Sequence, residues 1–121
     1  MYQIIKIGDH DVPMRSSAAT QYRFKAVFGT DLMSAIAKAS NSPEARTDVT
    51  ELLPMLGFIM ARQAADEKEW GKLNEQAFLE WAEQFDAADM SDALLDIMAV
   101  YKKNTRTTST PKNPEGAPSG R

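Results

Sequence analysis

The chain has 121 residues, of which 43% are hydrophobic, so it is long enough for one domain with a single core and too short for two. Its net charge of -3 gives no reason to expect binding to nucleic acid or to an anionic membrane. The absence of cysteine excludes disulfides and thiolate metal sites. The N-terminal residues carry charges and a turn signal where an export signal needs an apolar run, so nothing there marks the chain for export.

The N-terminal segment predicts a β-hairpin. Residues 2–7 are rich in Tyr and Ile, 8–11 have a turn composition, and Val12-Pro13-Met14 resumes the apolar rhythm. Pro13 cannot donate a ladder hydrogen bond, which places its strand at an edge or Pro13 at a strand end. The only histidine, His10, lies in the predicted turn between two aspartates. Adjacent residues alternate in direction, so a turn explains these three residues better than a metal site does.

Two short helices follow. Ser16 or Ser17 is a suitable N-cap for a helix to about Phe28, and Gly29 occupies the position of a left-handed C-cap. Ala19, Tyr22 and Ala26 share one face of this helix, with Phe24, Val27 and Phe28 beside it. Thr30 and Asp31 can cap a second helix that runs from Leu32 to about Ala39. Residues 40–43 break it, and 44–49 predict a loop or a loose turn of helix.

The stretch from Leu52 to Ala65 is apolar on every side of a helical wheel, which predicts a buried central helix. We expect it to start at Asp48 or Thr50 and to run to about Glu69. Its ten uncharged residues, 52–61, are far fewer than the roughly 20 that span a bilayer, so the helix belongs at the centre of a water-soluble domain. Pro54 is tolerable near a helix start or at a kink, and Gly57 indicates a close crossing by another helix.

The remaining pattern predicts a short connection at residues 70–73, a helix capped by Asn74, and a final helix. The first of these helices carries Phe78, Trp81, Ala82 and Phe85 on one face. After a break at 86–90, Ser91 caps the final helix, which runs to about Lys103 and is expected to bury Leu94, Leu95, Ile97, Met98 and Tyr101. Residues 104–121 contain no large apolar side chain and predict a disordered tail. The fold class is therefore mainly α (α+β): a domain at 1–103 with a short N-terminal β-hairpin packed on a bundle of about five helices, and a tail at 104–121.

The sequence suggests no enzyme. No Ser, Lys or Tyr has a sequence-local partner that would activate it, and there is no glycine-rich phosphate loop, so we predict no catalytic, cofactor-binding or metal site. The methionines at 55, 60, 90 and 98 fit either an adaptable groove or a core. Trp70 lies among charged residues at the polar end of the central helix. It is either an exposed anchor for a partner or a cover for the helix end.

The stretch RSSAATQYRFKAVFGTDLM, residues 15–33, resembles the opening of the tail assembly chaperones of long-tailed bacteriophages and related defective prophages. The resemblance rests on Ser17-Ala18-Ala19-Thr20, on the pair Tyr22-Arg23 and on Phe28-Gly29-Thr30-Asp31-Leu32. It extends to the order of parts: hairpin, paired short helices, apolar helix, aromatic helix, last helix and loose C-terminus.

This resemblance implies a non-enzymatic protein of the host cytoplasm that binds the tape measure protein, keeps it soluble and helps tail tube subunits to gather round it. Such chaperones are not retained in the finished virion. Many are also made in a longer form by a ribosomal frameshift, and the appended domain contacts the tail tube protein; the present chain would be the short form. On this hypothesis Tyr22 and Phe28 join Trp70 as candidate partner-binding residues. The methionine content and the free hairpin edge allow a homo-oligomer.

The alternative hypothesis is a small helical adaptor without viral context that binds a cellular partner through a helix-in-groove contact. Gene neighbourhood distinguishes the two, because a very long coiled-coil gene downstream favours the chaperone.

Overall fold

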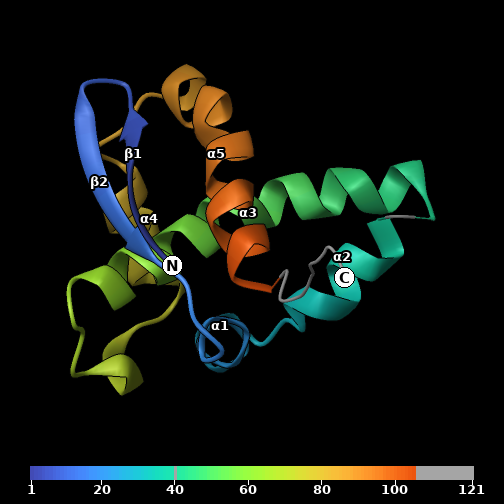
Figure 1. Cartoon of the computed structure of the whole chain (residues 1–121), viewed down its shortest axis with the longest axis horizontal. Helices are drawn as coiled ribbons and strands as arrows, with labels where there is room; N and C mark the ends of the chain where they lie inside the picture. Colours follow the sequence, from blue (N-terminus) through green and yellow to red (C-terminus); the bar gives the residue numbers. More distant parts are fainter. Residues whose placement is uncertain (40, 106–121) are drawn as a thin grey trace, which may run out of the picture.

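The computed structural model describes residues 1–39 and 41–105, and for residues 44–48, 104 and 105 the backbone alone. The described residues form a two-stranded hairpin and five α-helices, which confirms the predicted fold class (Figure 1). The elements are β1 (Tyr2–Ile7), β2 (His10–Arg15), α1 (Thr20–Phe28), α2 (Leu32–Ala39), α3 (Pro43–Ala64), the 3-10 helix η1 (Trp70–Lys72), α4 (Glu75–Ala82) and α5 (Ala87–Thr105). Residues 104 and 105, predicted as tail, continue α5, and the rest of the predicted tail lies outside the described residues.

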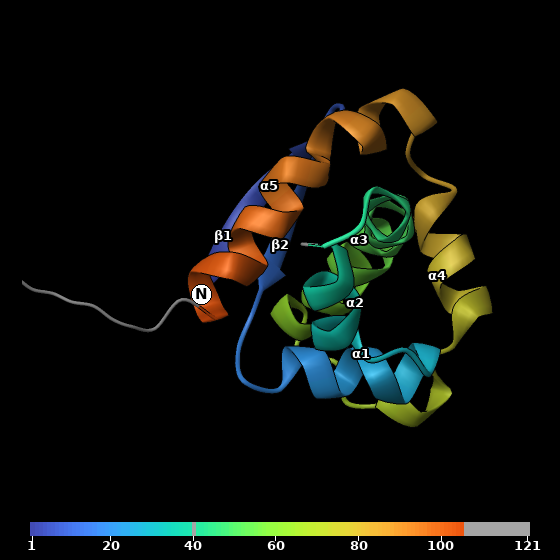
Figure 2. The same cartoon turned by 90° about the vertical axis from the view of Figure 1, so that its right-hand side faces the viewer.

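Helix α3 is the centre of the fold, as its all-round apolar pattern predicts. Five consecutive residues, Leu56 to Met60, are buried, and the helix contacts β2 and every other α-helix (Figures 1 and 2). A Cβ atom at Gly57 would lie 3.1 Å from Cδ1 of Ile97 in α5 and 3.3 Å from Cε of Met14 in β2. The predicted close crossing at Gly57 is therefore confirmed, with α5 as the crossing helix.

The bounds of α3 differ from the prediction at both ends. The helix begins at Pro43, well before Asp48, because proline is favourable at the first helical position, where its missing N–H has no intrahelical partner. It ends at Ala64, short of Glu69, because Asp66 adopts a left-handed conformation with φ 57° that no α-helix can include. Pro54, expected near a helix start, consequently lies inside α3.

The hairpin packs its inner face, Ile5, Ile7, Val12 and Met14, on α3 and α5. Ile7 pairs with His10, so the loop is only Gly8–Asp9, and Gly8 has the positive φ of 61° that two-residue loops favour. His10 is therefore the first residue of β2 and not a turn residue. Its exposed ring packs edge-on against Phe85, with 5.0 Å between centroids. At the other end of the hairpin, the buried Ser16 hydroxyl donates to the Val100 carbonyl at 2.9 Å.

The structure tests the predicted capping residues at both ends of α1 and at the start of α4. Gly29 ends α1 in a left-handed conformation with φ 73°, and Asn74 caps α4 by accepting the Ala77 N–H at 3.0 Å, so both predictions are confirmed. The N-cap of α1 is Ala19 and not a serine. The Ser17 hydroxyl instead accepts the N–H of Ala19 itself, at 3.1 Å, in a turn that precedes the helix.

Helix α5 corrects two further expectations. It begins at Ala87, so residues 87–90 of the predicted break at 86–90 are already helical and Ser91 is not the cap. Leu95, predicted to be buried, is 83% exposed. It lies about 200° round the helix from both Ala93 and Ile97, which belong to the buried face. The methionines confirm the core interpretation, since Met60 is fully buried and Met55, Met90 and Met98 pack against the core.

Candidate functional site

Tyr22 is the most exposed of the three predicted partner-binding residues, at 68%. It lines an open cavity of about 280 Å³ between α1 and α2, together with Gln21, Lys25, Asp31 and Met33. Met33 of α2 is itself 49% exposed, and its sulfur accepts a hydrogen bond of 3.1 Å from the Tyr101 hydroxyl of α5. Two adjoining helices thus present an aromatic and a thioether side chain to solvent at one place.

Trp70 is half-buried in η1, directly beside α1 (Figure 2). The Arg23 guanidinium of α1 lies 4.6 Å from the centroid of the Trp70 ring, which is the geometry of a cation–π contact. Both residues line a small polar pocket of about 160 Å³ with Arg15, Lys68 and others. Trp70 therefore packs partly against the core and presents the face of its ring to the exposed Arg23 guanidinium.

Phe28 lies on the opposite side of α1, facing the interior. Its ring packs on Phe24, Phe58 and Phe78 with centroid separations of 5.2, 6.3 and 5.9 Å, and the last contact is edge-on. The structure therefore places Tyr22 in one exposed face of α1, Trp70 at the margin of that face beside Arg23, and Phe28 in the aromatic cluster beneath it. We call this face, formed by Ala19, Tyr22, Arg23 and Ala26 with Trp70 and Met33 at its margins, the α1 face.

A polar network holds α1 on the C-terminal end of α3. The buried Thr20 hydroxyl donates to Oε1 of Gln63 at 2.7 Å, and Nε2 of Gln63 donates to the Ser17 hydroxyl at 3.2 Å. Arg15 donates to the Gln63 carbonyl at 2.5 Å and to the Asp66 carboxylate at 2.7 Å. These bonds fix the orientation of α1 and hence the direction in which Tyr22 and Arg23 point. Nothing in the local sequence around Gln63 indicates this role, because its partners lie more than forty positions away.

Ion pairs neutralise the carboxylates near the α1 face. The hydrogen bond from Arg15 lowers the pKa of Asp66, and that from Arg62 lowers the pKa of Glu67. Glu69 lies 3.3 Å from Lys72. Asp66 and Glu67 are thus ionised at neutral pH, and each of the three carboxylates is paired with a cation.

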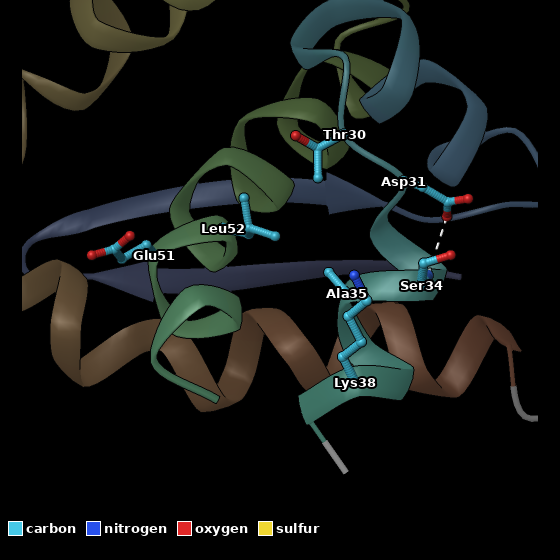
Figure 3. A pocket seen from close by; sticks show the side chains of 7 residues that line it. All are labelled: Thr30, Asp31, Ser34, Ala35, Lys38, Glu51 and Leu52. Atoms are coloured by element: carbon cyan, nitrogen blue, oxygen red, sulfur yellow. Dashed lines mark hydrogen bonds between the residues drawn. The ribbon is translucent and has the colours of Figure 1, made fainter. Parts of the chain in front are cut away.

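A second cavity of about 390 Å³ lies between α2 and α3 (Figure 3). Leu52 of α3 lies opposite Ala35 of α2, and the Asp31 carboxylate accepts the Ser34 N–H at 3.2 Å, as expected for a residue that caps α2. That hydrogen bond is the main cause of the lowered pKa of Asp31. The Ser34 side chain also hydrogen-bonds to the Asp31 carboxylate, and Thr30, Lys38 and Glu51 complete the polar part of the lining.

The part of the chain that the structure describes contains neither a cluster of metal-binding side chains nor a membrane-spanning helix. Among residues 1–39 and 41–105, no three His, Cys, Asp or Glu side chains are placed so that they could share a metal ion. Within the same ranges, no helix has the length and apolar content needed to cross a membrane.

Comparison of the chain with models of protein families, with curated proteins and with solved structures finds no match.

Proposed function

We propose that the chain is a tail assembly chaperone of a long-tailed bacteriophage or a related prophage. In this role it binds the tape measure protein, keeps that long helical protein soluble and helps to recruit tail tube subunits. The proposal continues the resemblance of residues 15–33 and the order of elements that accompanies it.

The observation that carries the proposal is the exposed apolar pair Tyr22 and Met33 on adjoining helices. A protein that keeps apolar helices soluble needs an accessible apolar surface, and helix-in-groove recognition provides one between or along helices. The same surface lies within the stretch that carries the resemblance. Its support is a rigid one, because α1 and α2 both pack on α3.

The remaining parts of the proposal follow from the family. The protein acts without catalysis in the host cytoplasm and leaves the particle before the virion is complete. A longer form, made by frameshifting, contacts the tail tube protein through its appended domain.

The test is co-expression with the very long helical protein encoded in the same gene cluster. We expect the tape measure protein to be soluble and to co-purify with the tagged chain, and to be insoluble without it. Recovery of an unrelated cellular protein under conditions in which tails assemble would favour the adaptor hypothesis. A tape measure protein that stays equally soluble in the absence of this chain would refute the proposal.

A further inference from the structure

The α1 face has an excess of positive charge in a chain whose net charge is negative. Helix α1 contains Arg23 and Lys25 and no acidic residue. The three carboxylates nearest to its Trp70 margin are paired with other cations, as Asp66 with Arg15, Glu67 with Arg62, and Glu69 with Lys72. Within the described residues, neither Arg23, Lys25 nor Lys68 has a carboxylate within 4 Å. Lys25 acts electrostatically on Asp31 and Lys68 on Asp66, but within the described residues none of the three cations is held in an ion pair, so each can pair with a partner's carboxylate.

The same face carries the side-chain types that dominate binding energy at protein interfaces, which are Trp, Tyr and Arg. Stacking on Trp70 holds the Arg23 guanidinium in place, so less side-chain entropy is lost when it binds a carboxylate. Successive residues of a helix are about 100° apart, which puts Arg23 and Tyr22 on the two sides of the small residues Ala19 and Ala26. A partner helix can therefore lie along α1 between the two large side chains.

We infer that the α1 face binds an acidic amphipathic helix, whose apolar side chains contact Tyr22 and Met33 and whose carboxylates pair with Arg23, Lys25 and Lys68. The inference rests on the proposed function only for the identity of the partner, which is then a segment of the tape measure protein. Helix α1 has nine residues and is about 13 Å long, so a bound helix lies along it for two to three turns.

Charge complementarity selects this partner over nucleic acid. The three available cations lie among paired carboxylates, and the net charge of the whole chain is -3. Proteins that bind nucleic acid by its phosphates present a continuous basic surface. A helix with a limited number of carboxylates at fixed spacing matches three cations better than a polyphosphate chain does.

The experiment uses the full chain and a synthetic helical peptide of about 18 residues with Leu at i, i+3, i+4 and i+7 and Glu on the other face. Binding is measured by titration calorimetry and by tryptophan fluorescence, to which Trp70 and Trp81 both contribute. We expect saturable binding that weakens as salt is added. A matched peptide with Lys in place of each Glu, and one with Ser in place of each Leu, should both bind about tenfold more weakly or worse.

Three variants test the surface. Arg23→Glu and Lys25→Glu should each weaken binding of the Glu–Leu peptide about tenfold, and Tyr22→Ala should weaken it by several-fold. Lys6→Glu, the matched control, makes the same charge change on the exposed hairpin, where Lys6 pairs with Asp11, and should leave the affinity within about twofold. Circular dichroism and thermal melting of each variant check that the fold is retained. Arg23 stacks on Trp70, so Arg23→Glu could change the packing of that ring as well as the charge. Lys25→Glu changes the charge without removing this contact, and it therefore tests the surface independently.

Several results would overturn the inference. One is equal weakening by Lys6→Glu and Arg23→Glu, and another is equal binding of the Lys and Glu peptides. Tighter binding of a single-stranded oligonucleotide would make nucleic acid the occupant. Self-association of the chain that is lost in Arg23→Glu would make a second copy the occupant.

Co-expression with the tape measure protein separates this inference from the proposed function. If the Arg23→Glu variant solubilises the tape measure protein as well as the unmodified chain does, the inference about the α1 face is refuted and the proposed function is retained. If the chain binds the acidic peptide through the α1 face but never binds the tape measure protein, the proposed function is refuted and the inference about the α1 face is retained.

Discussion

Replacing glycine by alanine at three positions separates backbone strain from steric conflict. Gly29 has φ 73° with open space around it, so the Gly29→Ala cost is the left-handed strain alone, about 1–2 kcal/mol, less about 0.4–1 kcal/mol from the stiffer unfolded chain. At Gly8, with φ 61°, an added Cβ would also lie 2.9 Å from Cγ of Asp89. Asp89 must move its carboxylate to make room, which costs about 0.5–1.5 kcal/mol as for a side chain forced off its rotamer. We expect a loss of about 1 kcal/mol at Gly29 and about 2 kcal/mol at Gly8.

Gly71 is the control, because its φ is not in the left-handed range and nothing lies within 4 Å of an added Cβ. Gly71→Ala should leave stability unchanged or raise it by up to about 1 kcal/mol. Urea unfolding followed by circular dichroism measures each change, provided that the slope of unfolding free energy against urea stays constant. In a double-mutant cycle, Asp89→Ala should recover about 1 kcal/mol or more of the Gly8→Ala loss and none of the Gly29→Ala loss.

Equal losses at Gly8 and Gly29 would show that Asp89 does not crowd the hairpin loop. A loss at Gly71 as large as that at Gly29 would mean that the backbone conformation is not what distinguishes these glycines. The first result would refute the described packing of the loop against α5, and the second would refute the assignment of the Gly29 loss to its left-handed backbone.

Three further predictions concern the core, the polar network and the acid limb of stability. Phe58→Ala should lower the unfolding free energy by about 3–5 kcal/mol because it opens a cavity in the aromatic cluster. Leu95→Ala should lower it by almost nothing because that side chain is 83% exposed. Urea unfolding of both variants measures the difference. Gln63→Leu leaves the buried Thr20 hydroxyl without its acceptor and should cost about 1–3 kcal/mol, and hydrogen exchange should show the loss concentrated in α1. The pKa of Asp66 is below its ordinary value of 3.8, so the ionised carboxylate stabilises the fold fully above that value, and this stabilisation is lost as the pH falls through the lower pKa of the folded state. Unfolding midpoints measured from about pH 6 to pH 2 should show this loss of stability. Arg15→Gln should remove the part of the pH dependence that comes from Asp66.

Much of the fold can be predicted from the sequence because its strongest patterns agree with the tertiary structure. The all-round apolar pattern from Leu52 to Ala65 predicts the central helix, and Gly29 and Asn74 end and begin helices where the backbone requires them. The hairpin follows from alternating apolar residues around Gly8. Each of these signals is local, so one sequence contains all that is needed.

The errors arise where distant contacts decide the local structure. The first turns of α3 are polar, and their helical conformation depends on proline at the first position and on the apolar turns that follow. Leu95 was expected to be buried because leucine usually is, but the buried face of α5 is set by where α3 and β1 lie.

The candidate site could be predicted only in part for the same reason. Tyr22 and Trp70 attract attention as aromatic residues in polar surroundings, and the structure places Tyr22 in the α1 face and Trp70 at its margin. The contributions of Trp70 and Met33 to this face depend on how η1 and α2 lie against α1. Phe28 differs from Tyr22 only in the side of the helix that it occupies, which a nine-residue segment with several aromatic residues does not determine.

The contact between the hairpin and α5 has a consequence for synthesis on the ribosome. The inner face of β1 is covered by α5, and Ser16 bonds to Val100 across a separation of 84 residues. At about 5–20 residues per second, the ribosome needs about 4–17 s to add those residues, and until then Ile5 and Ile7 have no α5 to cover them. A nascent chain arrested before α5 should therefore expose the hairpin to chaperones and proteases of the cell, and folding should complete only when the last helix has left the exit tunnel.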